Sequence, residues 1–454
     1  MNPDLRSFID RLSESTPEDV MRITEPLSLR YEVTAYVLEM ARRGKHPVFI
    51  FENFAGRASF PVVTNIFGTR KRYALALQAT EENVMAEWLK RSQRAIPPIT
   101  VSDAPTKQCI LLGEDANLSA LPVLTHFEQD AGPYITAGIV VAKDPDTGVR
   151  NASFHRCQVK GRNTLGISLH SRRHLWDYQR RAEARHKNLE VAVIIGLHPL
   201  ILFGTGLWKG PIDTDEYSVA GGFLGEPLEI VPCETLQLEA PAQAEIVIEG
   251  EIMADVREDE GPFGEFTGYA SHSSTRHVIK VKAITYRRDA LFQDIVPGLS
   301  QEHNSMLAVP AEPRMLEVLR RVVPSVRDVA YPFSGACRFH CYVSMEKIAE
   351  GQPKTAIFAA FAEDTSLKLV AVVDEDINVH REEEVLWAMA TRMQADKAIT
   401  VIPRCMGAML DPSAEDGSTA KTGIDATRPL KGWKATRCTV PTEVQDRIKQ
   451  ILPK

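Results

Sequence analysis

Glu260-Gly-Pro-Phe-Gly-Glu-Phe-Thr-Gly268 is a stretch in which two carboxylates stand five positions apart. Pro262 fixes its own φ, and the glycines around it accept the positive φ that a tight turn needs. We therefore expect a chain reversal that points Glu260 and Glu265 into one space, with two phenylalanines excluding water. Carboxylates near each other in an apolar wall have pKa values pushed apart, so one stays charged while the other carries a proton. The same letters also fit an ordinary β-turn with two solvated acids.

The composition is that of a water-soluble globular chain. It has 454 residues, 44% hydrophobic and 25% charged, which predicts two or three domains. The net charge of -7 gives no electrostatic reason to expect nucleic acid or an anionic membrane as partner. No apolar run approaches the ~20 residues of a membrane span, and the first residues lack the apolar core of a signal peptide.

Cysteine usage points to the same environment. The seven cysteines are scattered and form no Cys-x-x-Cys pair, which argues against a zinc ribbon or a redox motif. We expect reduced, mostly buried thiols in a cytoplasmic protein.

Composition and periodicity divide the chain into three parts, 1–100, 101–300 and 301–454. The first alternates helix and strand, and a segment rich in proline and small residues, 95–106, ends it. The second is rich in strands, among them 244–253, which alternates as a half-buried strand should. The third returns to alternating helix and strand, which predicts a two-layer α/β sandwich followed by a tail.

We expect helices over 4–13, 28–44, 82–90, 173–186, 313–322, 354–361, 382–393 and 441–451, and strands over 47–51, 61–67, 108–112, 135–141, 191–195, 244–253, 278–286, 339–344, 367–373 and 398–402. We also expect Asn378 or His380 to cap the helix that begins at 382.

Three polar residues upstream of the glutamate turn are candidate metal ligands. Asn151, His174 and Glu216 offer an amide oxygen, an imidazole nitrogen and a carboxylate, a set suited to Mn²⁺ or Mg²⁺. Spacing alone does not select them, since three such residues scattered over the chain are common in proteins without metal.

The whole set, in this order, resembles the UbiD-like decarboxylases, a family that uses prenylated FMN. The resemblance runs from about residue 100 to 430, and the N-terminal part looks similar as well. Its Glu-Gly-Pro-Phe-Gly-Glu block is highly specific, whereas the other blocks would be weak alone. The blocks are Asn151-x-Ser-x-x-Arg156, Arg173-His174-Leu175, Asp215-Glu216-Tyr217-Ser-Val-Ala-Gly221, Glu260-Gly-Pro-Phe-Gly-Glu265-x-x-Gly-Tyr269 and Lys421-Thr-Gly-Ile-Asp425-Ala-Thr427.

The resemblance implies a mixed α/β (α+β) fold of three domains. These are an N-terminal α/β domain, a central split β-barrel that binds the flavin, and a C-terminal two-layer α/β domain used for dimerisation. It implies a homodimer or higher even multimer and a flavin prenyltransferase that supplies the cofactor. It also implies that Asn151, His174 and Glu216 hold Mn²⁺ (or Mg²⁺) against the cofactor phosphate, with K⁺ or Na⁺ nearby.

The implied catalytic trio is Arg156, Glu260 and Glu265. A guanidinium pairs bidentately with a carboxylate, so Arg156 would hold the substrate and orient Glu260. Loss of CO₂ leaves an electron pair for which the flavin is the sink, and Glu265 would then protonate the carbon. The implied cofactor contacts are Ser153, Phe154, His155, Arg156, Arg173, His174, Gly206, Trp208 and Lys421. Arg172, Arg173, Arg180 and Arg181 could meet a phosphate, but arginines on a helix usually form a solvated face. That solvated interpretation is favoured for Arg180, whereas Arg173 fits phosphate contact equally well.

The expected reaction is the reversible, non-oxidative decarboxylation of an aromatic, heteroaromatic or α,β-unsaturated carboxylic acid. Related furan-dicarboxylate enzymes carry an arginine directly after the proline that Pro310 matches, but Ala311 stands here. A dicarboxylate is therefore disfavoured, although Arg314 lies close enough to substitute. His303 either faces the substrate or is a satisfied structural histidine.

Two other classes stay open. A split-barrel flavin oxidoreductase would consume NAD(P)H and gives no reason for the arginine and the two glutamates together. A non-catalytic subunit of a carboxylase complex would keep the fold but need partner chains for turnover.

Overall fold

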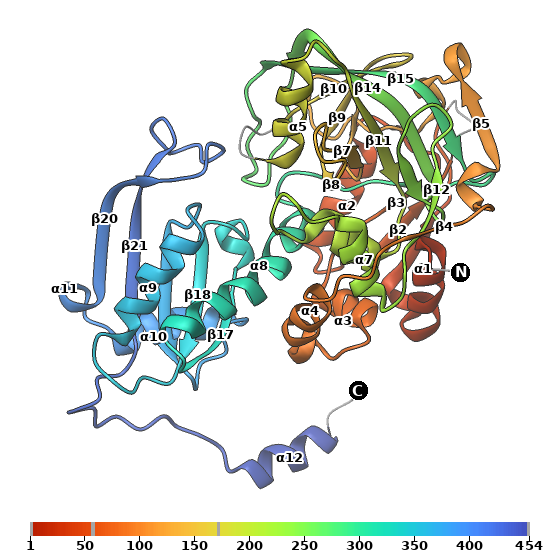
Figure 1. The fold of residues 1–454 in the computed structure, drawn as a ribbon. Coiled ribbons are helices and arrows are strands. Elements are labelled where there is room, and N and C mark those ends of the chain that lie inside the picture. The colour runs from red at the N-terminus through yellow and green to blue at the C-terminus, as the bar shows by residue number, and fades with distance from the viewer. Residues whose placement is uncertain (1–2, 56–59, 170–172, 452–454) are drawn as a thin grey trace.

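The computed structural model describes residues 3–55, 60–169 and 173–451. Two bodies are joined by one long helix, and the chain ends in a tail that leaves the smaller body and passes below both (Figure 1). The larger body holds the N-terminal and central parts of the chain, and the smaller one holds the C-terminal part. No helix among the described residues is long and apolar enough to cross a membrane.

The N-terminal part builds a small sheet. Its order is β1-β2-β3-β16, and the last strand, β16 (Phe292–Gln293), returns from the far end of the central part to pair with β3. The first helix forms because Leu5, Phe8, Ile9 and Leu12 share one buried face, and Asp4 accepts a hydrogen bond from the Ser7 amide at its start. The elements are α1 (Leu5–Ser15), β1 (Val20–Ile23), α2 (Glu32–Arg42), β2 (Val48–Phe51), β3 (Val62–Thr64), α3 (Arg70–Leu77) and α4 (Val84–Ser92).

The central part is a nine-stranded sheet built on one long antiparallel pair. Strands β14 (Ile246–Glu260) and β15 (Ser274–Tyr286) run side by side, and the glutamate turn is their connection. The strand order is β6-β9-β10-β15-β14-β11-β7-β8, with β5 paired to β15. The other elements are β5 (Cys109–Leu112), β6 (Tyr134–Ile135), β7 (Ile139–Lys143), β8 (Arg150–Phe154), β9 (Cys157–Gly161), β10 (Thr164–Ile167), α5 (His174–Glu183), β11 (Leu189–Ile195), α6 (Pro199–Leu202), η6 (Phe203–Leu207) and α7 (Glu216–Leu224).

A third, smaller sheet lies where the proline-rich segment was expected to be a plain connection. Strand β4 (Ile99–Thr100) pairs with β12 (Glu229–Pro232), which pairs in turn with β13 (Glu239–Pro241). The segment therefore contributes a strand as well as a link.

The C-terminal part is a five-stranded sheet of order β17-β18-β19-β21-β20. Side chains from α8 and α9 cover one face, and α10 covers the other. In β19 the buried Val370 and Val372 face the first layer, and Ala371 and Val373 face the second, so this strand is apolar throughout. The elements are α8 (Gln301–Val322), β17 (Val326–Ala330), β18 (His340–Met345), α9 (Gln352–Glu363), β19 (Leu369–Asp374), α10 (Glu382–Arg392), α11 (Ala395–Ala398), β20 (Ile399–Met406), β21 (Ser418–Ala426) and α12 (Thr442–Ile451).

The largest difference from the sequence-based expectation is α8, which begins at Gln301 instead of 313 and contains Pro310 and Pro313. Its start is held by Ser300, whose hydroxyl accepts from the His303 amide. The buried Glu302 accepts from the amides of Asn65 and Phe67. These contacts tie the first turn to the N-terminal part and stabilise the helix ahead of its prolines.

Two further expectations need correction. Helix α3 was missed because its arginines look like a solvated stretch, whereas Arg72 is buried and donates to the carbonyl oxygens of Asn65 and His46. Neither Asn378 nor His380 caps α10, whose N-cap residue is Arg381 without a side-chain cap bond.

Candidate active site

Arg156 and the two glutamates meet at one point of the central sheet. Arg156 lies between β8 and β9, Glu260 is the last residue of β14, and Glu265 follows in the turn. The guanidinium donates from Nε to Glu260 Oε1 and from Nη2 to Glu260 Oε2, both at 2.9 Å, which is a bidentate pair. Its Nη1 donates to Glu265 Oε1. The expected convergence of the two carboxylates is confirmed, and the picture of two solvated acids is wrong because Glu260 is fully buried.

The turn is held in place from outside. The amide of Gly261 donates to Tyr134 Oη at 3.1 Å, and that of Gly264 donates to Asp130 Oδ1 at 2.9 Å. Gly261 has φ +84°, which favours glycine. A Cβ on Gly264 would meet the ring of Phe127 at 2.4 Å, so only glycine fits there. The backbone between the two glutamates is therefore fixed by its surroundings.

The two phenylalanines of the turn have different neighbours. The Phe263 ring lies 4.8 Å from the Arg156 guanidinium carbon and 4.6 Å from the Tyr134 ring centroid, so it shields the ion pairs from water. The Phe266 ring lies 5.5 Å from that of Phe339, just before β18 in the C-terminal part. The turn thus touches both bodies.

Burial and charge give Glu265 the properties of an acid. Burial raises the pKa of the Glu265 carboxyl, and the nearby Arg156 guanidinium opposes this shift. The pKa of Arg156 is raised by its hydrogen bonds to Glu260 and the charge of Glu265, which together outweigh its own burial. A permanent cation thus stands beside a carboxyl that keeps its proton more readily than an exposed glutamate does.

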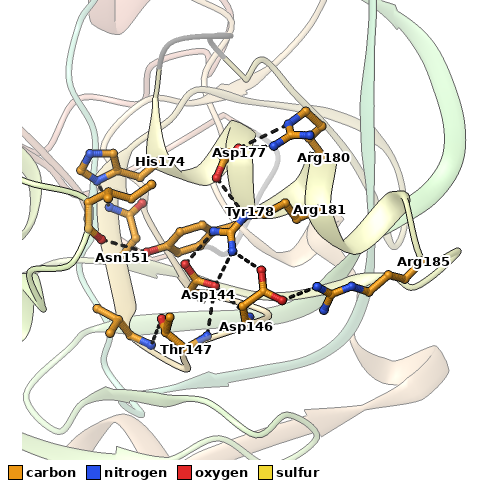
Figure 2. A network of polar contacts seen from close by, with 12 residues as sticks. Asp144, Asp146, Thr147, Asn151, His174, Asp177, Tyr178, Arg180, Arg181 and Arg185 are labelled. Atoms are coloured by element: carbon orange, nitrogen blue, oxygen red, sulfur yellow. Dashed lines mark hydrogen bonds and ion pairs between the residues drawn. The ribbon is translucent and has the colours of Figure 1, made fainter.

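The three candidate metal ligands also come together. Asn151 lies in β8, and His174 and Glu216 are the first residues of α5 and α7. Asn151 Nδ2 lies 2.9 Å from Glu216 Oε1 and 3.4 Å from His174 Nδ1, and the last two atoms are 4.0 Å apart. Figure 2 shows the amide of Asn151 and the ring of His174 facing each other.

Glu216 is the buried carboxylate of this group. It is 5% exposed and has no lysine or arginine ion pair among the described residues. Burial raises its pKa to about 8, although the amides of Ala152 and Asn151 donate to it. A hard cation would keep this carboxylate charged, with the Asn151 amide turned to present its oxygen. Among the described residues, no group of three His, Cys, Asp or Glu side chains is arranged to hold a metal ion.

The arginines of α5 are engaged with acids. The guanidinium of Arg181 donates to both carboxylate oxygens of Asp144, at 2.8 and 2.6 Å. Its Nε donates to one carboxylate oxygen of Asp177 at 2.9 Å (Figure 2). Arg180 binds Asp177 at 2.8 Å. These pairs hold the helix that begins with His174, and they favour the structural interpretation of both arginines. Arg172 lies outside the described residues.

The other candidate cofactor residues lie in two places. Ser153 Oγ is 3.1 Å from His155 Nε2, and Gly206 approaches Phe154 so closely that a Cβ would lie 2.4 Å from the ring. Trp208 follows Gly206 in the same segment. Lys421, by contrast, is in β21 of the C-terminal sheet, where its ammonium donates to the carbonyl oxygens of Thr365 and Leu367. The structure gathers the others in the central part and keeps Lys421 in the other body.

Some residues of the site had no signal in the sequence. Tyr134 and Asp130 support the glutamate turn, but they precede it by more than 120 positions.

His303 lies within 3.3 Å of the Gly298 carbonyl oxygen, and burial lowers its pKa to about 4, so its ring is neutral. This bonding is sufficient for a structural role.

Comparison with known proteins gives matches over most of the chain. Models of the 3-octaprenyl-4-hydroxybenzoate carboxy-lyase N-terminal, Rift-related and C-terminal domains match residues 14–92, 99–300 and 304–426. An anhydromevalonate phosphate decarboxylase of Methanothermobacter thermautotrophicus is 38% identical over 94% of this chain and 97% of its own length.

Solved structures agree with these matches. The UbiD-class enzyme HmfF of Pelotomaculum thermopropionicum, in complex with FMN, is 38% identical with a TM-score of 0.93, over 99% of this chain and all of that one. An evolved dimeric form of the same enzyme, 37% identical over 99% of this chain and all of its own, is in complex with prFMN, with a TM-score of 0.89. Apo 3,4-dihydroxybenzoic acid decarboxylase of Klebsiella pneumoniae is 29% identical over 99% of both chains, with a TM-score of 0.90.

Proposed function

Because the chain belongs to the UbiD family of carboxy-lyases, we propose that it uses prenylated FMN to remove CO₂ from an sp² carbon, reversibly and without net oxidation. The observation that carries this proposal is the guanidinium of Arg156, which binds Glu260 through two nitrogens and Glu265 through the third. A flavin oxidoreductase has no use for this arrangement, whereas a decarboxylase needs both an anchor for a carboxylate and a proton donor.

The cofactor would be held by the central part of the chain. Asn151, His174 and Glu216 would hold Mn²⁺ or Mg²⁺ against its phosphate, with K⁺ or Na⁺ nearby. The first turn of α5 has no side-chain cap among the described residues, so its amide groups favour an anion. When bound, the modified flavin supplies the electron sink for the pair left behind as CO₂ departs. The remaining contacts are Ser153, Phe154, His155, Arg156, Arg173, Gly206 and Trp208, and Lys421 if the two bodies close.

Arg156 would receive the substrate carboxylate. Glu260 occupies Nε and Nη2, so Nη1 is the nitrogen through which the guanidinium reaches a further anion. Glu265 holds that nitrogen in this structure. A carboxylate arriving there displaces Glu265 from the arginine, and Glu260 keeps the guanidinium plane in position.

Glu265, once released, would deliver the proton. The bond from the sp² carbon to the carboxylate breaks, CO₂ leaves, and the electron pair finally takes the Glu265 proton to form a C–H bond. Burial of Glu265 favours the protonated form that this step requires. In the reverse direction its carboxylate removes the same hydrogen.

Within the class of aromatic, heteroaromatic and α,β-unsaturated acids, we infer an α,β-unsaturated substrate. The support is the decarboxylase of anhydromevalonate phosphate, which is 38% identical across nearly the whole chain; HmfF is equally identical, and the dihydroxybenzoate enzyme is 29% identical. Anhydromevalonate phosphate is the first acid to test.

The protein would act as a homodimer or higher even multimer. Large apolar side chains of the β20 and β21 region are exposed, among them Val401 (62%), Met406 (52%) and Met409 (75%). Helix α12 buries none of its residues although Val444, Ile448 and Ile451 are apolar. Exposed apolar side chains of this kind favour a second copy as their cover.

The test is the mass and the ultraviolet-visible spectrum of the flavin bound after co-expression with a flavin prenyltransferase, followed by assay with anhydromevalonate phosphate. The proposal expects a prenylated flavin and release of CO₂. Unmodified FMN under these conditions, or reduction of substrate at the expense of NAD(P)H, would contradict it.

A further inference from the structure

A loop of the central part is bonded to the glutamate turn from outside. It consists of residues 126–131, shortly before β6, and we call it the supporting loop. Its Asp130 accepts hydrogen bonds from three backbone amides. Oδ2 accepts from His126 at 3.2 Å and from Phe127 at 2.9 Å, and Oδ1 accepts from Gly264 at 2.9 Å. One carboxylate thus closes the loop on itself and ties it to the turn.

Further contacts join the same two segments. The amide of Ala131 donates to the Pro262 carbonyl oxygen at 2.9 Å, in the direction opposite to the bond from Gly264. The Phe127 ring lies so close to Gly264 that a Cβ there would come within 2.4 Å of it, and a Cβ on Gly298 would lie at 2.9 Å. The supporting loop and the turn are therefore held as one unit by hydrogen bonds and by close packing.

The supporting loop is in turn anchored to the buried core. His126 Nε2 lies 3.1 Å from Asp294 Oδ1, and both side chains are buried. The hydroxyl of Thr136 donates to the same Asp294 oxygen at 2.9 Å and accepts from the Ile295 amide at 3.0 Å. These bonds give Asp130 a fixed position relative to the central sheet.

Asp130 also lies within charge range of Glu265. Burial is the main reason that the pKa of the Glu265 carboxyl is raised. The charges of Glu260 and Asp130 add to this shift, whereas Arg156 opposes it. The carboxylate that fixes the amide next to Glu265 therefore also favours the protonated form of the acid.

We propose that Asp130 is a positioning residue for proton delivery, which acts on Glu265 by holding the amide of Gly264. This rests on the proposed function and deepens it, because proton delivery then depends on a residue outside the trio. A fixed backbone at 264 limits where the Glu265 side chain can go when a substrate carboxylate displaces it from Arg156. A misplacement of about 1 Å in a catalytic group can lower the rate 10²-fold.

Two substitutions separate position from charge. In Asp130→Asn the one remaining oxygen can serve the amides of His126 and Phe127, and the NH₂ group then faces the Gly264 amide, donor against donor. This variant loses both the bond to the turn and the negative charge. Asp130→Glu keeps the charge but displaces the carboxylate by one methylene. Glu128→Gln is the matched control, because Glu128 is an exposed acid of the same loop.

The first measurement is decarboxylation of anhydromevalonate phosphate by the prenylated holoenzyme over a range of pH. Asp130→Asn should lower kcat roughly 10-fold to 100-fold, with KM, flavin occupancy and Tm close to wild type. The fall of kcat with rising pH should move to lower pH, because removing a negative charge lowers the pKa of Glu265. Asp130→Glu should lose rate without moving that limb, and Glu128→Gln should match wild type.

The second measurement needs no substrate. In protein loaded with unmodified FMN, infrared difference spectra follow the carbonyl stretch of protonated Glu265 with pH, and Glu265→Gln identifies the band by its absence. The midpoint should lie at lower pH in Asp130→Asn than in wild type or in Glu128→Gln. A failure of the proposed substrate is thereby distinguished from a failure of the role given to Asp130.

Several outcomes overturn the inference. One is wild-type kcat in Asp130→Asn, and another is an equal loss in Glu128→Gln. A rise in KM that accompanies loss of flavin and a lowered Tm would mark Asp130 as support for the fold alone. If Asp130→Asn does not fold, wild-type kcat in Asp130→Glu contradicts the need for an exact position. If wild-type holoenzyme turns over no anhydromevalonate phosphate, the proposed substrate falls, and an unmoved infrared midpoint in Asp130→Asn then overturns the inference as well.

Discussion

Replacing Glu265 by glutamine isolates the proposed proton delivery from everything else that this residue does. In the structure Glu265 Oε1 accepts from Arg156 Nη1, and a glutamine side-chain oxygen accepts the same bond. The turn that carries Glu265 is held by Tyr134 and Asp130, which the substitution does not touch. We therefore expect the variant to fold, to bind flavin and to bind substrate.

The expected loss is that of a positioned general acid. Such a group contributes roughly 10²–10⁴-fold to the rate, or about 3 to 5 kcal/mol in the barrier. Because burial raises the pKa of Glu265, its protonated form persists to higher pH than that of an exposed glutamate. In the wild-type protein kcat for decarboxylation should fall as pH rises through this pKa, and the glutamine variant should lack that limb.

The assay is exchange of the product's vinyl or ring hydrogen with D₂O, followed by NMR. Exchange is the protonation step run backwards, so it depends on the Glu265 carboxylate. Glu260→Gln is the informative comparison, because it loosens the bidentate pair with Arg156 and should raise KM as well as lower kcat. Wild-type exchange rates in Glu265→Gln, with flavin occupancy unchanged, would mean that another group handles the proton.

Three further predictions follow from the metal trio, from α8 and from the exposed apolar surface. Glu216→Ala should lose both metal and flavin while staying folded, measured by elemental analysis and absorbance; full flavin occupancy without metal would refute the bridge. Burial raises the pKa of the Glu302 carboxyl to about 7, above its value in the unfolded chain. The folded state therefore holds the carboxyl proton more tightly than the unfolded state does. The free energy of unfolding should fall by on the order of 3 kcal/mol as pH rises through 7. Glu302→Gln should flatten the dependence of Tm on pH between 5 and 8, and an unchanged slope would contradict this. Light scattering should show a dimer or higher even multimer that Val401→Asp weakens, whereas a concentration-independent wild-type monomer would argue against the proposed interface.

Much of the fold was predictable because the spacing of apolar residues along a short segment determines whether it forms a helix or a strand. Apolar and polar residues alternate before Glu260, which indicated β14. The spacing of apolar residues in α1 and α2 indicated their buried faces. The first half of α8 was not predictable, because Pro310 and Pro313 argue against a helix. The helix is stabilised instead by hydrogen bonds from the N-terminal part to Glu302, and these join residues 235 or more positions apart.

The site divides in the same way. The convergence of Glu260 and Glu265 could be predicted because proline and glycine impose a turn between them. That Arg156 belongs with the two glutamates followed only from the family resemblance, and its bond to Glu265 was not predicted. The support from Tyr134 and Asp130 had no local signal in the sequence.

The measurement that tests the central claim most directly is exchange of labelled CO₂ into the carboxylate of anhydromevalonate phosphate. It reports breaking and remaking of the one bond at issue, whichever direction equilibrium favours. Protein loaded with prenylated FMN should incorporate label, protein with unmodified FMN should not, and Glu265→Gln should do so far more slowly. Absence of exchange in the prenylated holoenzyme, with substrate shown to bind, would contradict the assignment of Arg156, Glu260 and Glu265 as a decarboxylation site.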